Sequence, residues 1–140
     1  MLLLDLLTDD EYIWKFYVLA RSEEDCELHD FLNSLSVKDK EAWSGLLAIM
    51  ETMAAAPEGP RLMDSLSHEM GSAKYKIYRF EKGRLRIAWF YGEGNKVVIC
   101  SHGYYKKSQK TPEKEIKKAE KNVEAYLRAV EGKGERNGKN

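Results

Sequence analysis

Three consecutive stretches within residues 74–105 alternate apolar and polar side chains in the manner of half-buried strands. They read KYKIYRFE, RLRIAWFY and KVVICSHGYY. Lys82-Gly83 separates the first two stretches, and Gly92-Glu93-Gly94-Asn95 separates the last two. Connections this short that contain glycine join neighbouring antiparallel strands. The segment therefore predicts a three-stranded antiparallel meander at the centre of the fold.

A further strand and two helices are expected before this meander. Residues 12–19, YIWKFYVL, are aromatic and β-branched, and they predict a strand that joins the same sheet. Ser22 with Asp25, and Ser36 with Asp39, have the spacing of helix-capping pairs. The apolar stripe behind the first pair is Leu28, Phe31, Leu32 and Leu35, and the stripe behind the second pair is Trp43, Leu46, Leu47, Met50, Met53 and Ala54.

The last helix is predicted to begin at Thr111-Pro112, because threonine caps helices well and proline suits the first helical position. Its inward stripe is Ile116, Ala119, Val123, Tyr126, Leu127 and Val130. Residues 131–140, EGKGERNGKN, have no apolar member and are expected to form a flexible basic tail. The predicted fold class is α+β: a small antiparallel sheet, two N-terminal helices packed on it and a C-terminal helix, in one domain over residues 1–130.

Charge is divided unevenly along the chain, although the whole sequence has 23 basic and 23 acidic residues and no net charge. Residues 1–70 carry 5 basic and 15 acidic side chains, whereas residues 71–140 carry 18 and 8. This asymmetry predicts a surface for a polyanion in the second half and a flank that binds something basic in the first. The simpler interpretation is that a basic terminal helix and tail raise the second count.

Several classes of protein are disfavoured by what the sequence contains. The cysteines Cys26 and Cys100 are too few for a disulfide framework, and no apolar run approaches the roughly 20 residues that span a bilayer. The opening MLLLDLLTDD runs directly into acids, unlike a signal peptide, so a cytoplasmic location without a membrane partner is expected. The three histidines have no metal-ligand spacing, and no phosphate-loop or nucleophile-elbow motif is present, so no metal or cofactor is expected.

Arginines on the predicted strands are the first candidates for chemistry. Strand alternation puts Arg84 and Arg86 on one face of their strand, and it puts Arg79 with Tyr75 and Ile77 on one face of the preceding strand. An unpaired guanidinium over a packed sheet is costly, so Arg79 and Arg86 are expected either to bind an anion or to pair with acids of the first helices.

A dense basic and aromatic segment follows the third strand of the meander. The segment reads SHGYYKKSQKTP and leads directly into the start of the last helix. Cations bind phosphates and aromatic rings stack on unpaired bases, so this composition favours binding of single-stranded RNA. Its candidate residues are His102, Tyr104, Tyr105, Lys106, Lys107 and Lys110. The alternative is a solvated charged face.

These features together resemble the RelE/ParE toxin superfamily, in its phage-derived, HigB-like branch. The most specific part is GRLRIAWFYGEGNKVVICSHGYYKKSQKTPEKEIKKA, residues 83–119, and DFLNSL at residues 30–35 matches more weakly. The resemblance implies a RelE-like fold and a toxin of a type II toxin–antitoxin pair, held by a cognate antitoxin of helix-turn-helix type.

The resemblance also implies an activity. Relatives of this pattern inhibit translation as ribosome-dependent, metal-free mRNA endoribonucleases, in which the RNA 2′-hydroxyl attacks the adjacent phosphorus. The partners would then be mRNA and ribosomal RNA on the ribosome. Two alternatives stay open: a non-catalytic inhibitor of the gyrase type, and a degenerate phage-derived domain that binds RNA or protein.

Site residues follow from the same resemblance. Arg79, Arg86, Lys107, Lys110 and His102 take catalytic roles, and Arg84, Tyr104, Tyr105, Lys106 and Lys76 bind RNA. Arginine forks suit the equatorial oxygens of a phosphorane, and a lysine among other cations can act as a general base. Tyr104 or Tyr105 would stack on a splayed base, and His102 would protonate the leaving oxygen. The sequence departs from the branch at Ile77, where an acidic residue is typical.

Overall fold

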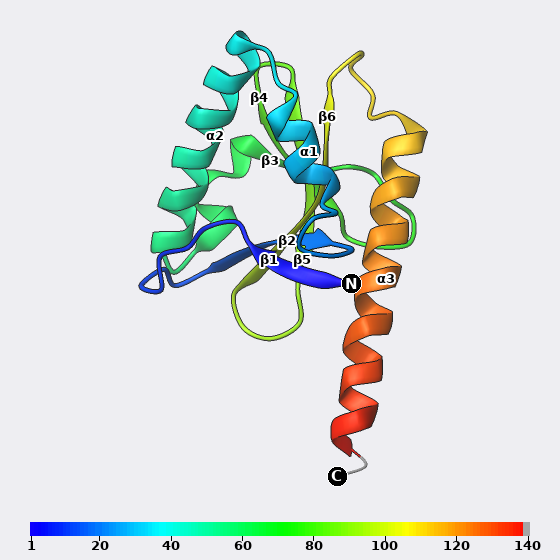
Figure 1. The fold of residues 1–140 in the computed structure, drawn as a ribbon. Coiled ribbons are helices and arrows are strands. Elements are labelled where there is room, and N and C mark those ends of the chain that lie inside the picture. The colour runs from blue at the N-terminus through cyan, green and yellow to red at the C-terminus, as the bar shows by residue number, and fades with distance from the viewer. Residues whose placement is uncertain (139–140) are drawn as a thin grey trace.

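The computed structural model describes residues 1–138, with side chains described for residues 1–63 and 68–131, and it confirms the α+β class (Figure 1). The strands are β1 (Leu2–Asp5), β2 (Lys15–Ala20), β3 (Ser67–Glu69), β4 (Tyr78–Lys82), β5 (Leu85–Tyr91) and β6 (Val97–Tyr105). The helices are α1 (Glu27–Asn33), α2 (Val37–Ala55), the 3-10 helix η1 (Gly59–Leu66) and α3 (Glu113–Gly138). No described helix is long and apolar enough to cross a membrane.

The six strands form one sheet in the order β1-β2-β6-β5-β4-β3. The pairs β4·β5 and β5·β6 are antiparallel, which confirms the predicted meander. The strand expected at residues 12–19 is β2, and it joins the sheet beside β6 as a parallel neighbour. The edge strands β1 and β3 have no counterpart in the sequence analysis, because they are only 4 and 3 residues long.

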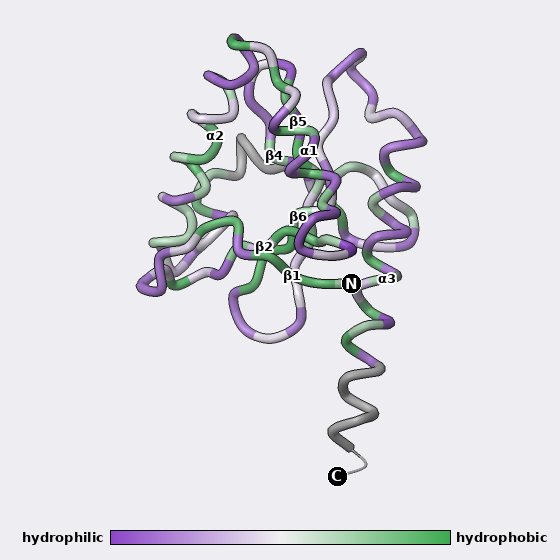
Figure 2. The backbone as a smooth tube through the Cα atoms, in the orientation of Figure 1, coloured by the Kyte–Doolittle hydropathy of each residue, from purple (hydrophilic) through white to green (hydrophobic). Residues whose placement is uncertain are grey.

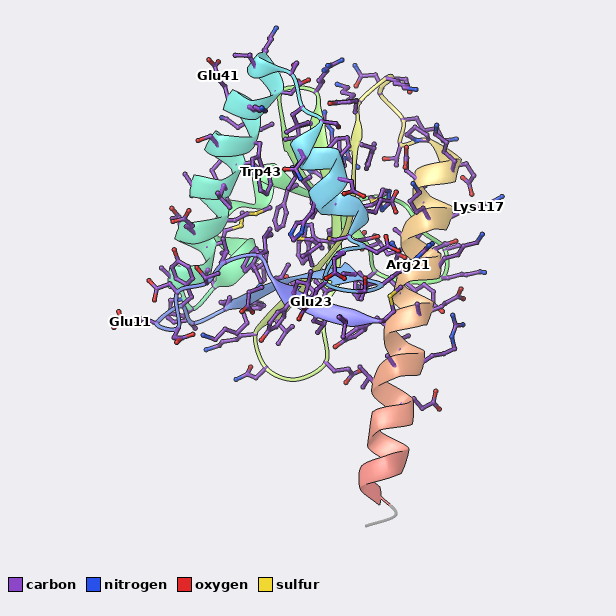
Figure 3. All side chains as sticks on the ribbon, viewed as in Figure 1. Glu11, Arg21, Glu23, Glu41, Trp43 and Lys117 are labelled. Carbon is purple, nitrogen blue, oxygen red and sulfur yellow. The ribbon has the colours of Figure 1, made fainter. Side chains whose placement is uncertain are left out.

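The two faces of the sheet are covered by different helices. On one face, Leu85, Ile87 and Trp89 of β5 belong to a core that includes the apolar stripes of α1 and α2. On the other face, Ala88 and Phe90 pack with the inward stripe of α3. Figure 2 shows the turns of α2 alternating between hydrophobic and hydrophilic, as a helix that covers a core should. In Figure 3, Glu41 lies on the outside of α2 and Trp43 on the side facing α1.

The two predicted helix caps have different outcomes. Ser36 caps α2 as expected, since its hydroxyl oxygen accepts a hydrogen bond from the Asp39 amide at 3.3 Å. The Ser22 cap is wrong, because α1 begins only after Cys26. Ser22 and Asp25 instead close a turn in which the Asp25 amide donates to the Ser22 carbonyl at 3.2 Å. The chain leaves β2 at Ala20, so a reversal comes before the helix.

Helix α3 carries the predicted inward stripe except at Leu127, which is 37% exposed. Ile116, Ala119, Val123 and Tyr126 are buried against the sheet. The helix continues to Gly138, so most of residues 131–140 lie within it rather than in an irregular segment. The mobility of that segment stays a prediction.

One glycine of β6 decides how closely α1 approaches the sheet. A Cβ atom at Gly103 would come within 2.4 Å of the Phe31 ring. Gly103 therefore makes room for α1 inside a continuous strand and does not mark a turn. The turn at Gly83, with φ +57, is where glycine is required for backbone reasons.

Candidate functional site

A hollow of about 140 Å³ lies where β4, β5 and β6 meet the loop that leads into α3. We call it the basic hollow, because five cationic side chains and a single carboxylate line it. Six of the ten predicted site residues gather here: Arg79, Arg86, Tyr104, Lys106, Lys107 and Lys110. Glu81 and residues 108–112 complete the lining.

Sheet register brings the inner side chains of the basic hollow together. Glu81 of β4 lies opposite Arg86 of β5, and Arg86 lies opposite Tyr104 of β6. Side chains that are directly opposite in antiparallel pairs point to the same face. Arg79 is two residues from Glu81 on β4, so it shares that face as well. Three neighbouring strands thus present a guanidinium, a carboxylate and a phenol on the face that α3 covers.

Glu81 holds both arginine heads in place. Its Oε2 atom accepts from Arg79 Nε at 3.1 Å and lies 3.2 Å from Arg86 Nε. Arg86 Nη1 donates to the carbonyls of Gly83 and Leu85, each at 2.9 Å. These contacts replace the pairing with acids of the first helices that the sequence analysis left open.

The outer nitrogens of the two guanidinium groups differ in how they are used. Arg79 Nη1 donates to the Glu69 carbonyl at 3.1 Å and to Thr111 Oγ1 at 3.3 Å. Among the described residues, Nη2 of Arg79 and Nη2 of Arg86 have no hydrogen-bond partner. Since the Arg86 side chain is only 9% exposed, it is a nearly immobile donor with spare capacity for an anion.

Tyr104 contributes a buried hydroxyl rather than an exposed ring. The residue is 7% exposed, and its hydroxyl oxygen is buried with no hydrogen-bond partner. Burial raises the pKa of Tyr104, although the charges of Arg79 and Arg86 and the nearby Thr111 hydroxyl oppose the rise. Thr111 lies close without completing a well-formed hydrogen bond. The phenol is therefore neutral near pH 7, and it is an unused donor at the wall of the basic hollow.

The lysines form an exposed rim around this buried interior. Lys106, Lys107 and Lys110 are all solvent-exposed. Their loop is fastened at its start by the Lys106 amide, which donates to the Arg84 carbonyl at 2.7 Å. Near its end, Ser108 Oγ donates to the Lys110 carbonyl at 3.0 Å. The rim places mobile cations around a fixed pair of arginines.

Arg84 and Tyr105 lie on the opposite face of the sheet. Arg84 Nη2 donates to Asp39 Oδ2 at 2.6 Å, and its guanidinium carbon lies 4.2 Å from the centre of the Tyr105 ring. The Tyr105 ring in turn packs against Phe31 with 5.1 Å between centroids. The expectation that Arg84 shares the face of Arg86 is wrong, because Arg84 precedes β5 and lies in its turn. The Arg84 guanidinium also lowers the pKa of Asp39.

His102 is fully buried and does not line the basic hollow. Its Nδ1 atom lies 2.9 Å from Ser101 Oγ, and its Nε2 atom lies 3.1 Å from Glu115 Oε1. Asn122 Nδ2 donates to the same serine oxygen at 2.7 Å. Burial lowers the pKa of His102, against the opposing charge of Glu115. The histidine thus joins β6 to α3 through hydrogen bonds and has no open path to a substrate.

Lys76 is exposed and lies outside the basic hollow, so the structure does not bring it to the other candidates. Glu81 is the site residue that the sequence analysis missed. Its two-residue spacing from Arg79 was the available signal, because a strand places such residues side by side on one face. Among the described side chains, no group of three or more His, Cys, Asp or Glu residues is placed to hold a metal ion.

Fold and site together define a class of protein: a small α+β domain with a cation-lined hollow at the end of its central strands. A family model described as "Phage derived protein Gp49-like" matches residues 30–124. The chain belongs to this Gp49-like family, a toxin-like family of the RelE/Gp49 type. No curated protein gives a significant match. The matched segment contains the whole basic hollow and leaves β1 and β2 outside.

Proposed function

We propose that this protein is a toxin that inhibits translation by cutting mRNA on the ribosome. The observation that carries the proposal is the basic hollow, in which Glu81 fixes Arg79 and Arg86 beside the unpartnered hydroxyl of Tyr104. Preorganised donors of this kind stabilise the charge that develops on a phosphorus centre during displacement. The proposed partners are mRNA with ribosomal RNA, and a cognate antitoxin that keeps the toxin inactive.

The proposed reaction is transesterification within the RNA. The 2′-hydroxyl oxygen bonds to the adjacent phosphorus and the bond from phosphorus to the 5′ oxygen breaks. The products are a 2′,3′-cyclic phosphate and a 5′-hydroxyl. A rim lysine, Lys107 or Lys110, accepts the 2′-hydroxyl proton, and Tyr104 donates a proton to the departing 5′ oxygen. The Nη2 atoms of Arg79 and Arg86 bind the non-bridging oxygens.

Dependence on the ribosome follows from the size of the basic hollow. A volume of about 140 Å³ accepts a phosphate group and little more, so the protein alone does not orient two successive nucleotides. An aligned intramolecular attack gains roughly 7–11 kcal/mol from orientation, which the ribosome would supply by holding the message. The exposed lysine rim would dock on ribosomal and messenger phosphates, so binding should weaken as salt rises.

Expression in growing bacteria with mapping of mRNA 5′ ends tests the proposal. Wild type should stop growth and create new 5′ ends within translated regions, and Arg86→Ala should do neither. The matched control is Lys76→Ala, which removes an exposed cation outside the basic hollow and should behave as wild type. Arrest of growth by Arg86→Ala without new ends would overturn cleavage and favour the gyrase-type inhibitor. A wild type that neither arrests growth nor creates ends would indicate a degenerate binding domain.

A further inference from the structure

An apolar groove lies between the N-terminal edge strand and the second half of α3. We call it the terminal groove; it has a volume of about 570 Å³, four times that of the basic hollow. Met1, Leu2 and Leu3 form one wall, and Tyr126, Ala129 and Val130 of α3 form the other. Figure 1 shows the N-terminus beside α3, and Figure 2 shows β1 as a hydrophobic stretch leading to that point.

The wall formed by β1 is unusually unprotected. Met1, Leu2 and Leu3 are 49%, 43% and 40% exposed. The strand is the last in the sheet and pairs only with β2, which leaves its outer backbone edge open. Edge strands of monomeric proteins are commonly blunted by charge, proline or a bulge. The only charged residue of β1 is Asp5 at its far end, so Met1 before the strand and Leu2 and Leu3 within it face solvent at an open edge. A patch of this kind marks a binding surface.

Charge identifies the chemistry of the occupant. The terminal groove continues past Met1 and Leu19 into a second hollow of about 300 Å³, lined by Asp25, Glu27 and Asp30. Glu27 pairs with Lys118 at 2.6 Å, whereas neither Asp25 nor Asp30 forms an ion pair with the described residues. Arg21 is the single cation in this lining. An occupant with an apolar stripe and basic residues at one end would fit both the terminal groove and the acidic hollow beside it.

The terminal groove is separate from the basic hollow. The loop at residues 106–112 precedes α3, whereas the groove meets α3 just past its midpoint, so the two sites lie apart along that helix (Figure 1). The groove also lies outside residues 30–124, the segment that the family model matches. The groove is therefore a feature added to the family domain by segments at its two ends.

We propose that the terminal groove docks an amphipathic helix of a partner protein, with its apolar face on β1 and α3 and its basic end over Asp25 and Asp30. Helices commonly bind in this way, through apolar anchors spaced along one face. The identification of that partner as the neutralising antitoxin rests on the proposed function. The docking surface itself does not, because none of its residues belongs to the basic hollow.

The test measures binding of the protein encoded by the adjacent reading frame to the full-length chain, by titration calorimetry. Leu3→Asp should raise the dissociation constant at least tenfold, since it places a charge in the apolar wall. Val37→Asp is the matched control, because Val37 is 78% exposed on α2 and lies outside the groove. Asp25→Lys with Asp30→Lys should weaken binding less and reduce its dependence on salt.

Circular dichroism and thermal melting establish that each variant is folded. Binding of Leu3→Asp within twofold of the Val37→Asp control would overturn the docking surface, as would a wild-type chain that does not bind the neighbouring protein. Cleavage of mRNA is measured in parallel. Cleavage with binding that does not depend on Leu3 removes the docking proposal alone, whereas binding that depends on Leu3 without cleavage removes the proposed function alone.

Discussion

Arg84 and Arg86 are two residues apart in the sequence and lie in opposite kinds of environment. Arg84 has a dedicated carboxylate, Asp39, and an aromatic ring beneath it, so its charge is fully used inside the protein. Arg86 shares Glu81 with Arg79, so two guanidinium groups divide one negative charge. Arg84 is therefore neutralised by its own partner, whereas Arg86 is held in place with positive charge that its partner does not balance, as the proposed binding of phosphate requires.

Removing the under-neutralised arginines should give the largest effect. Arg79→Ala and Arg86→Ala are each expected to lower the rate of mRNA cleavage by roughly 10²–10³-fold, the effect of losing one preorganised donor. Single-turnover cleavage on programmed ribosomes measures this rate. Arg84→Ala should stay within about twofold of wild type, as exposed substitutions away from a site do. Equal losses of cleavage rate for Arg84→Ala and Arg86→Ala would show that the different environments of the two arginines do not matter for activity.

Substitution of Glu81 tests whether holding the arginines matters. Glu81→Gln removes the shared charge and should lower kcat by up to ~100-fold, the effect of misplacing a catalytic group by about 1 Å. KM for the ribosome should change little, because the lysine rim is intact. Glu81→Asp, which keeps the charge, should recover part of kcat. A fall confined to KM, or no recovery with aspartate, would show that Glu81 does not act by positioning.

Tyr104→Phe separates function from stability. Loss of the hydroxyl should reduce cleavage by about 10²-fold, the lower end of what a positioned general acid contributes. The same change removes a buried hydroxyl that has no partner, so the free energy of unfolding should rise by about 1 kcal/mol. Denaturant unfolding measures that change. A destabilised variant with unimpaired cleavage would place Tyr104 in the core instead of the site.

Substitution of Asp39 should have the smallest effect on activity, but it should change how thermal stability depends on pH. The pKa of Asp39 is lowered when folded, chiefly by its hydrogen bond from Arg84, so its ionised form stabilises the fold at neutral pH. That contribution is lost as pH falls below about 4 and through the lowered pKa. The difference in Tm between wild type and Asp39→Asn should therefore shrink on acidification, with cleavage unchanged. A difference that stays constant down to pH 2 would contradict the ion pair.

Local signals in the sequence predicted much of the fold. The Ser36–Asp39 cap and the glycine-containing turns depend on residues close together in the chain, and both are confirmed in the structure. The edge strand β1 was missed because its pairing with β2 depends on a long-range contact and not on its own short pattern. The parallel pairing of β2 with β6 has the same cause, since these strands are far apart in sequence.

The candidate site was predictable in composition and not in arrangement. The sequence showed the basic cluster that follows β6, and strand alternation assigned Arg79 and Arg86 each to one face of its own strand. The short turn at Gly83 sets Glu81 opposite Arg86, but the sequence did not show that one carboxylate would contact both Arg79 and Arg86. The burial of His102 follows from the covering helix α3, whose Glu115 contacts the imidazole, and this long-range contact has no local signal. Strand alternation also failed at Arg84, because that residue precedes the strand.

The most direct test of the central claim is the chemistry of the RNA ends made by purified protein on a ribosome programmed with a defined message. The basic hollow predicts a 2′,3′-cyclic phosphate and a 5′-hydroxyl from wild type and from Arg84→Ala, and intact message with Arg86→Ala. Intact message with wild type would show that the protein does not cut RNA, and cutting by Arg86→Ala at the wild-type rate would show that the basic hollow is not where it cuts.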